Sequence, residues 1–473
     1  MSVTGPRPPS VERLLAAVRT RPGERAHEAL VAAARQTIAE ERERLAGGAD
    51  PRPIDALADT VLARLDAHVA DALPARVINA TGVIVHTNLG RAPWPAAAIR
   101  AAEAATREPL FLEMDQATGR RGRRYGLAED HLVALTGAED ALVTNNCAAA
   151  LVLAVGLAGR KGVIVGRGEL VEIGGGVRIP EIVRRAGARL VEVGTTNRTR
   201  VEDYEAPLRE GRASMVLRVH PGNFTMAGFT EAPHPAELAA LAHAHGALVI
   251  DDLGSGALLD TAAFGLAHEP TPAERLAAGA DLVTFSGDKL VGGPQAGLIV
   301  GRADLVGRLR KDPLARAMRP DKATLAGVAA TLGLYRAGLA VAEVPVWRMI
   351  ATPVDELRVR AERLLFRFRV STVEGVSIVD SLATVGGGSL PGQALPSVGF
   401  ALTVNRPEIV LGALRAHDPA VVGRIEDGRV LLDLRTVPPE ADGDLGQAVA
   451  DVLAAVEDGT RGRSAGGADP AEA

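Results

Sequence analysis

Between about residue 76 and residue 300, short runs of β-branched and other apolar residues alternate with longer stretches of helical periodicity. This alternation constrains the fold more than any other feature, because strands of a parallel sheet are connected by helices that cover both of its faces. The runs lie at residues 141–144, 162–165, 189–193, 215–219, 247–250, 282–285 and 298–300. The segment therefore predicts an α/β domain built on a mostly parallel sheet.

The remaining sequence predicts further domains on either side of this one. Residues 1–72 predict a small helical N-terminal module, whose three helices are separated by Pro22-Gly23 and by the stretch 47–53. We expect the large α/β domain over residues 73–345, a smaller α+β domain over 346–457 and a disordered tail over 458–473. Within the smaller domain we expect a helix over 353–368, short strands near 376–379 and 398–404, a helix over 407–416, a hairpin within 421–434 and a last helix.

Composition excludes several classes of protein. The net charge of −5 argues against nonspecific coating of nucleic acid, and the single cysteine, Cys147, excludes a disulfide framework or thiolate metal cluster within one chain. No apolar run is long enough to cross a bilayer, and the N-terminus does not have the pattern of a signal peptide. We therefore expect a cytoplasmic protein with no membrane segment and no metal site.

The chain uses arginine almost wherever it needs a cation. Lysine and arginine together number 53, yet lysine occurs only at Lys161, Lys289, Lys311 and Lys322. A guanidinium is never usefully nucleophilic, so a lysine in such a chain indicates a position where an amine is required, as in Schiff-base formation. The alternative for each lysine is ordinary sequence drift.

Lys289 lies in the sequence SGDKLVGGPQAG at residues 286–297, directly after the predicted strand 282–285. A strand that ends in a glycine-rich turn presents the lysine at the carboxyl edge of a parallel sheet, where α/β proteins bind ligands. The glycines allow close approach of the backbone to a bulky group. This pattern predicts that Lys289 holds pyridoxal 5′-phosphate as a Schiff base, and that Ser286 also contacts the cofactor.

Two further strand ends support this cofactor. The sequence IDDLGSG at residues 250–256 places an aspartate where a carboxylate keeps the cofactor ring nitrogen protonated. Asp252 is the first choice for this role and Asp251 the alternative. The sequence TNNCAAA at 144–150 turns a strand into a helix, whose N-terminus is suited to a phosphate group. Asn146, Cys147 and Ala148 are therefore predicted phosphate ligands.

Longer motifs resemble a known family, the bacterial selenocysteine synthases, or L-seryl-tRNA(Sec) selenium transferases. The resemblance covers nearly the whole chain, and one of its motifs is INATGVIVHTNLGR at residues 78–91. The other matching segments are residues 9–15, 167–176, 192–199 and 386–392. Cys147, in the predicted phosphate turn, departs from the family pattern, in which asparagine is expected.

The resemblance implies an aspartate-aminotransferase-like (fold-type I) α/β enzyme that converts L-seryl-tRNA(Sec) to L-selenocysteinyl-tRNA(Sec) for selenoprotein synthesis. It implies a dehydroalanyl (aminoacrylyl) intermediate and selenophosphate as the selenium donor, with Arg91, Arg316 and Arg319 receiving the donor's phosphate. It also implies that residues 1–72 bind the tRNA and that the protein is a homo-oligomer, a decameric ring of dimers. Asp288 is a candidate for protonating the serine hydroxyl as it leaves.

Two other functions remain open at this point. One is a small-molecule pyridoxal-phosphate β-eliminase, such as an aminosugar-phosphate ammonia lyase, in which the three arginines would bind a substrate phosphate. The other is a noncatalytic tRNA-binding scaffold with a vestigial cofactor site. The helical module at residues 1–72 argues against the first, and the presence of Lys289 and Asp252 argues against the second.

Overall fold

The computed structural model describes residues 7–21, 23, 25–70, 74–124, 126–370 and 375–464. The chain divides into two compact units, residues 1–76 and 77–473. The predicted boundary at residue 72 lies outside the described residues, as does Pro22 of the first predicted break. The predicted domain limits therefore stay predictions, and each unit is described here by itself.

The first unit contains three helices, α1 (Val11–Arg19), α2 (His27–Ala46) and α3 (Ile54–Ala70). Ser10 caps α1 by accepting a hydrogen bond from the backbone N–H of Arg13 at 3.2 Å. Apolar side chains from all three helices pack into one core. Its buried members are Leu14, Leu15, Val18, Leu30, Ala33, Ala34, Ile38, Leu57, Ala58 and Val61.

A buried carboxylate joins α2 to the segment before α3. Glu41 is 1% exposed and accepts hydrogen bonds from Arg44 Nε at 3.0 Å, from Arg52 Nε at 2.7 Å and from the Arg52 backbone N–H at 2.9 Å. The Arg44 hydrogen bond, supported by those from Arg52, lowers the pKa of Glu41 to about 2. Glu41 therefore stays charged inside the unit, and its contacts fix the turn between the two helices.

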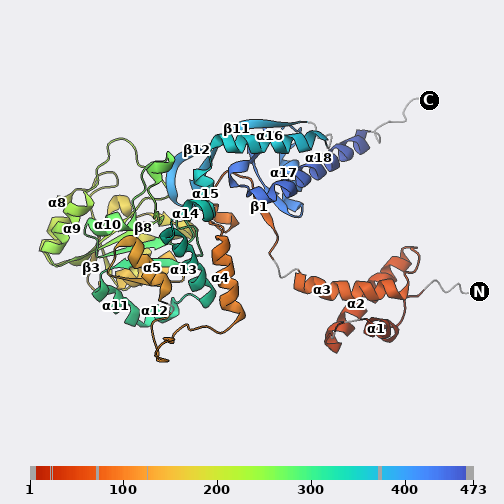
Figure 1. Cartoon of the computed structure of the whole chain (residues 1–473), viewed down its shortest axis with the longest axis horizontal. Coiled ribbons are helices and arrows are strands. Elements are labelled where there is room, and N and C mark those ends of the chain that lie inside the picture. Colours follow the sequence, from red (N-terminus) through yellow and green to blue (C-terminus); the bar gives the residue numbers. More distant parts are fainter. Residues whose placement is uncertain are drawn as a thin grey trace, which may run out of the picture. The chain divides into compact units, whose positions relative to one another are not determined.

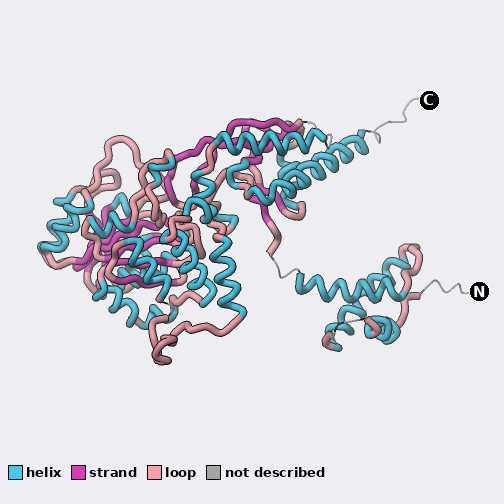
Figure 2. The backbone as a smooth tube through the Cα atoms, in the orientation of Figure 1, coloured by secondary structure: helices cyan, strands magenta, loops and turns pink. Residues whose placement is uncertain are grey.

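The second unit is built on a seven-stranded sheet in the order β2-β10-β9-β8-β7-β3-β6. Figures 1 and 2 show strands of this sheet lying among helices. The strands are β2 (Asp140–Thr144), β3 (Gly162–Gly166), β6 (Arg189–Val193), β7 (Ala213–Val219), β8 (Leu248–Gly254), β9 (Leu282–Ser286) and β10 (Gly297–Gly301). Only β10 runs antiparallel to its neighbours, β2 and β9, so the mostly parallel sheet predicted from the alternating runs is confirmed.

Helices cover both faces of this sheet. On one face lie α6 (Cys147–Gly156), α7 (Ile179–Arg185) and α11 (Ala303–Lys311), which share a core with β3 and β7. On the other face, α5 (Leu127–Thr136) and α13 (Lys322–Arg336) pack on β9 and β10, and α13 also contacts α4 (Ala96–Arg107). Burial on both faces explains why the strands read as continuous apolar runs rather than alternating ones.

The C-terminal part of this unit has its own four-stranded antiparallel sheet, in the order β11-β12-β15-β14. Its strands are β11 (Val376–Gly386), β12 (Ser389–Leu402), β14 (Arg424–Glu426) and β15 (Arg429–Asp433), and it packs against α16 (Val354–Val370), α17 (Pro407–Ala416) and α18 (Asp442–Ser464). The predicted hairpin within 421–434 is confirmed by the β14–β15 pairing. The short β13 (Ala420–Val422) pairs in parallel with β1 (Val77–Asn79), which brings the start of the unit to its C-terminal part.

Strands lie at the predicted positions near 376–379 and 398–404, but they are longer than predicted, because β11 and β12 form one long hairpin that turns at Gly387 and Gly388. Pro391 and Pro396 lie within β12, although proline cannot donate a hydrogen bond to a neighbouring strand. They are tolerated because β12 pairs with β15 only from Gly399 to Leu402, so its earlier residues have one free edge.

The last helix also ends later than the sequence predicts. α18 includes residues 458–464, which the composition assigned to a disordered tail, because an existing helix gains a hydrogen bond with each added residue. Residues 465–473 lie outside the described residues. Among the helices that are described, none is long and apolar enough to span a membrane.

Candidate active site

Lys289 lies three residues beyond the end of β9, at the carboxyl edge of the seven-stranded sheet. It lines a cavity together with residues from segments far apart in the sequence. The other residues of the wall are Thr87, Arg91, Val171, Gly174, Val219, His220, Pro221, Gly222, Asn223, Phe224, Asp252, Leu253, Gly254, Gly387 and Gly388. The sheet edge predicted to bind a ligand therefore carries a cavity around the predicted lysine.

The glycines that leave room for the Lys289 amine are not those of its own motif. A Cβ atom on Gly254 would lie 3.5 Å from Lys289 Nζ, and one on Gly388 would lie 3.1 Å from it. The motif glycines instead pack against protein, as at Gly287, where a Cβ would lie 2.5 Å from the Pro294 carbonyl oxygen. The expectation that the motif glycines face a bulky ligand is therefore wrong. They allow the lysine turn to pack closely against other parts of the protein.

The two adjacent aspartates of β8 point into different cavities, because successive side chains of a strand face opposite sides of the sheet. Asp252 lines the Lys289 cavity, and its Oδ1 accepts hydrogen bonds from Thr284 Oγ1 at 2.7 Å and from Cys147 Sγ at 3.6 Å. Burial raises the pKa of Asp252, an effect that the Thr284 hydrogen bond partly opposes. Asp251 lines a second cavity, where its carboxylate lies 3.5 Å from Arg275 Nε.

The N-terminus of α6 lies beside Asp252. Asn146 caps this helix by accepting a hydrogen bond from the Ala149 N–H at 2.8 Å, and Cys147 is its first residue. Burial raises the pKa of the Cys147 thiol well above its ordinary value, so it is a neutral donor to Asp252. These contacts bring the predicted phosphate turn to the predicted ring-nitrogen ligand, while Ala148 makes no described contact with either.

Asp288, next to the lysine, is buried in an ion pair. Arg91 Nη1 lies 3.0 Å from Asp288 Oδ2, and Ser286 Oγ donates a hydrogen bond of 2.6 Å to Asp288 Oδ1. Arg91 itself has a positive φ of 65°, which non-glycine residues adopt rarely. The structure therefore brings Arg91 to the Lys289 cavity and engages Ser286 with Asp288.

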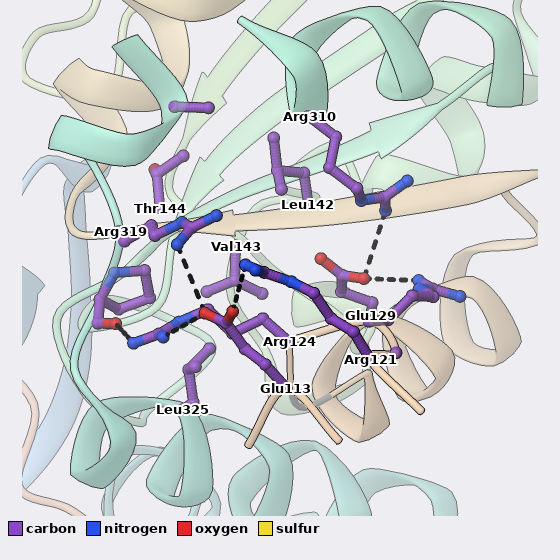
Figure 3. Close-up of a pocket in the computed structure, with 14 residues that line it drawn as sticks. Glu113, Arg121, Arg124, Glu129, Leu142, Val143, Thr144, Arg310, Arg319 and Leu325 are labelled. Carbon is purple, nitrogen blue, oxygen red and sulfur yellow. Dashed lines mark hydrogen bonds and ion pairs between the residues drawn. The ribbon is translucent and has the colours of Figure 1, made fainter. Parts of the chain in front are cut away.

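Arg319 lines a different cavity of about 300 Å³ (Figure 3). There Glu113 lies among three guanidinium groups, at 3.3 Å from Arg319 Nη1, 2.9 Å from Arg124 Nη1 and 2.7 Å from Arg121 Nη2. Arg316 is exposed on α12 (Pro313–Ala317), which ends before Arg319. Within one chain, the structure does not bring these two arginines to the cavity of Lys289 and Arg91.

Comparison with known proteins identifies the family. The family model described as L-seryl-tRNA selenium transferase matches residues 77–438. The chain belongs to this family. The L-seryl-tRNA(Sec) selenium transferase of Hyphomonas neptunium is 48% identical over 373 residues, which are 78% of this chain and 80% of that protein. The enzyme of the same name from Rhizobium meliloti is 42% identical over 445 residues, which are 92% of this chain and 95% of that protein.

A solved structure shares the fold of this selenium transferase family member. D-glucosaminate-6-phosphate ammonia-lyase is 20% identical, with a TM-score of 0.58 over 82% of this chain and 98% of that chain. At that identity the likeness concerns the fold alone. The expected fold-type I α/β architecture is confirmed by this likeness together with the sheet order.

Sequence reasoning missed several residues of the cavity wall in this family member. His220 and Asn223 follow β7, and Gly388 lies in the β11–β12 turn. The strand before His220 was predicted correctly, so its position at a strand end was a usable signal. Gly388 belongs to a segment that carried the family resemblance, but its place beside Lys289 depends on a long hairpin that the sequence did not predict.

Proposed function

We propose that this protein is a pyridoxal-phosphate-dependent transferase that converts L-seryl-tRNA(Sec) to L-selenocysteinyl-tRNA(Sec). The observation that carries the proposal is the family match over residues 77–438, with Lys289 in a cavity at the carboxyl edge of the sheet. Relatives with this activity in their names cover up to 92% of the chain.

The residues around Lys289 fit the cofactor. Glycines 254 and 388 leave space beside Lys289 Nζ that any larger side chain would fill. Asp252 is a buried carboxyl group with a raised pKa, and no ion pair to it occurs among the described residues. A protonated ring nitrogen would provide that missing positive partner. Lys289 would hold the cofactor covalently, Asp252 its ring nitrogen, and the α6 N-terminus with Asn146 and Cys147 its phosphate.

When bound, pyridoxal phosphate withdraws electrons from the α-carbon of an attached amino acid. Lys289 Nζ is the base placed to remove the α-proton of the serine and later to return it. Asp252 keeps a proton at the ring nitrogen, and Arg91 keeps Asp288 in place beside the lysine. Loss of the serine hydroxyl as water would give dehydroalanyl-tRNA. The selenium of selenophosphate would add to its β-carbon, with a proton returned to the α-carbon, and water would cleave the P–Se bond and release phosphate.

The proposal also covers the selenium donor, the oligomer and the binding of the tRNA. Arg91, Arg316 and Arg319 bind the phosphate of selenophosphate, since guanidinium groups bind phosphate in a bidentate manner. Arg316 and Arg319 lie outside the Lys289 cavity of their own chain, which is compatible with a homo-oligomeric ring of dimers. The helices of residues 1–72 bind the tRNA, and the protein works in the cytoplasm.

The test incubates purified, cofactor-loaded protein with seryl-tRNA(Sec) and selenophosphate and measures selenocysteinyl-tRNA(Sec). The protein should be yellow, and borohydride should fix the cofactor to Lys289. Lys289→Ala should lose the visible band, the fixation and the activity, whereas Lys311→Ala should keep all three. Turnover of an aminosugar phosphate, with none of seryl-tRNA(Sec), would instead favour the small-molecule lyase. Binding of tRNA without cofactor or turnover would favour the scaffold.

A further inference from the structure

His220 lies directly after β7 and separates two cavities. It lines the Lys289 cavity on one side and the cavity of Asp251 on the other. Its backbone N–H donates a hydrogen bond of 2.9 Å to the Asp252 carbonyl oxygen, so its position is tied to the strand that carries the predicted ring-nitrogen ligand. Its side chain is 17% exposed, which leaves part of the imidazole open to a ligand.

A buried carboxylate lies behind this imidazole. Glu269 is 3% exposed, and its Oε1 lies 3.1 Å from His220 Nε2. Burial raises the pKa of Glu269, but His220, Ser255 and the charge of Lys289 together leave that pKa below its ordinary value. Glu269 is therefore an anion that favours a proton on Nε2 and leaves Nδ1 as the ring atom free to exchange one.

The polar groups around this pair are not fully satisfied. Glu269 Oε1 and Ser255 Oγ are buried, and neither has a hydrogen-bond partner in good geometry among the described residues. The Ser255 carbonyl oxygen accepts a hydrogen bond from the N–H of Leu290, so the cluster directly adjoins the lysine turn. Unsatisfied groups of this kind are rare in folded proteins and call for a functional explanation.

Asp288 is poorly arranged to act as an acid in the same cavity. Its carboxylate accepts hydrogen bonds from Arg91 and Ser286, and an ion-paired carboxylate is an acceptor of protons in such bonds. An imidazolium with an anion behind it has a proton to give and is restored by uptake from solvent.

We propose that His220, supported by Glu269, is a further acid–base residue of the Lys289 cavity and provides the proton that the leaving serine hydroxyl takes up. This inference rests on the proposed function. In the elimination, the Cα–H bond breaks and its proton goes to a base, while its electron pair forms the Cα=Cβ bond. The Cβ–O bond breaks with its pair on oxygen, which takes the proton from His220 Nδ1 and leaves as water.

Other charged groups lie around His220. They come from the segment before α10 (Pro272–Ala277), from β8, from the lysine turn and from the segment after β1. These groups are Glu269, Asp251, Asp252, Lys289 and Arg91. Glu269 is the only one of them with an ion-pair contact to the imidazole among the described residues, so it is the group that positions the ring.

The experiment compares His220→Asn and Glu269→Gln in the cofactor-loaded full chain, using seryl-tRNA(Sec) and selenophosphate. His243→Asn is the matched control, because His243 Nε2 lies 3.0 Å from Asp281 in a second histidine–carboxylate pair away from the cavity. His220→Asn should lower turnover by about 100-fold or more. Its visible band, and the change of that band on adding seryl-tRNA(Sec), should remain, since neither needs the imidazole.

Two readouts separate proton transfer from structural support. Free imidazole should restore part of the turnover of His220→Gly, and Glu269→Gln should lower kcat while leaving the KM for seryl-tRNA(Sec) unchanged, because Glu269 contacts the imidazole. Turnover of His220→Asn within about threefold of wild type, loss of its visible band, or absence of imidazole rescue would each refute the proposal. Wild-type protein that keeps its cofactor but does not convert seryl-tRNA(Sec) would refute the proposed function itself.

Discussion

Replacing Gly388 by alanine adds one carbon atom to the Lys289 cavity, so it tests whether the free space beside the lysine is needed. The new Cβ would lie 2.6 Å from Asn223 Oδ1 and 3.1 Å from Lys289 Nζ. To reach ordinary contact at 3.4 Å, the amide oxygen would have to retreat by about 0.8 Å and the amine by about 0.3 Å. Displacements approaching 1 Å cost up to about 100-fold in rate, so we expect kcat/KM for seryl-tRNA(Sec) to fall between about 10- and 100-fold.

Gly392 offers a matched control in the same hairpin. Gly388 has a φ of 78° and Gly392 a φ of 74°, so alanine at either position carries similar backbone strain, of about 1–2 kcal/mol. A Cβ on Gly392, however, would meet nothing within 4 Å. Both variants should lose stability in urea denaturation through this strain, while only Gly388→Ala should show the fall in kcat/KM. Equal activity of the two variants would show that the space beside Lys289 Nζ is not needed.

Four further outcomes follow from the structure. Arg319→Ala or Arg316→Ala should cost about 2–4 kcal/mol of transition-state stabilisation, measured as kcat/KM for selenophosphate, with the visible cofactor band intact. Unchanged turnover in both variants would show that these arginines do not bind the donor. Asp252→Asn should lower turnover at least about 100-fold, or about 2.7 kcal/mol, because an amide cannot neutralise a protonated ring nitrogen; a wild-type rate would exclude that role. Deleting residues 1–72 should leave the cofactor bound but weaken tRNA(Sec) binding at least about tenfold, or about 1.4 kcal/mol, in a filter-binding assay, and the loss should depend on salt. Full affinity would show that the helical module does not bind the tRNA. Glu41 has a lowered pKa, so its contribution to stability is present at pH values above its ordinary pKa and is lost as the pH falls from 4.5 to about 2. In Glu41→Gln, hydrogen exchange of the α2 amides should show little of this acid dependence. An unchanged dependence would show that other groups cause it.

The sequence predicted the sheet well, because its strands are buried on both faces and leave an unambiguous apolar pattern. β8 shows the limit of that pattern. Its apolar run stops at Ile250, but the strand continues through Asp251 and Asp252 to Gly254. The extension decides which aspartate faces Lys289, since that follows from alternation along a strand rather than from residue type.

The candidate site was predictable only where its parts are close to strand ends. Lys289, Asp252 and Arg91 do line one cavity, as expected from their positions and the resemblance. Glu269 could not be predicted, because it lies in a loop between η4 (Thr261–Phe264) and α10 (Pro272–Ala277), and only packing brings it to His220. Contacts of this kind depend on tertiary structure that no local pattern encodes.

The β11–β12 turn also determines when the active site can exist. Lys289 belongs to the first sheet, but the wall of its cavity includes Gly387 and Gly388 from the second. A ribosome synthesises the lysine well before these glycines, and domains fold as their residues emerge. A nascent chain that stops before residue 386 therefore has the reactive lysine in a cavity open on one side. Capture of the cofactor becomes a late event in the biogenesis of this protein, following the docking of the C-terminal hairpin.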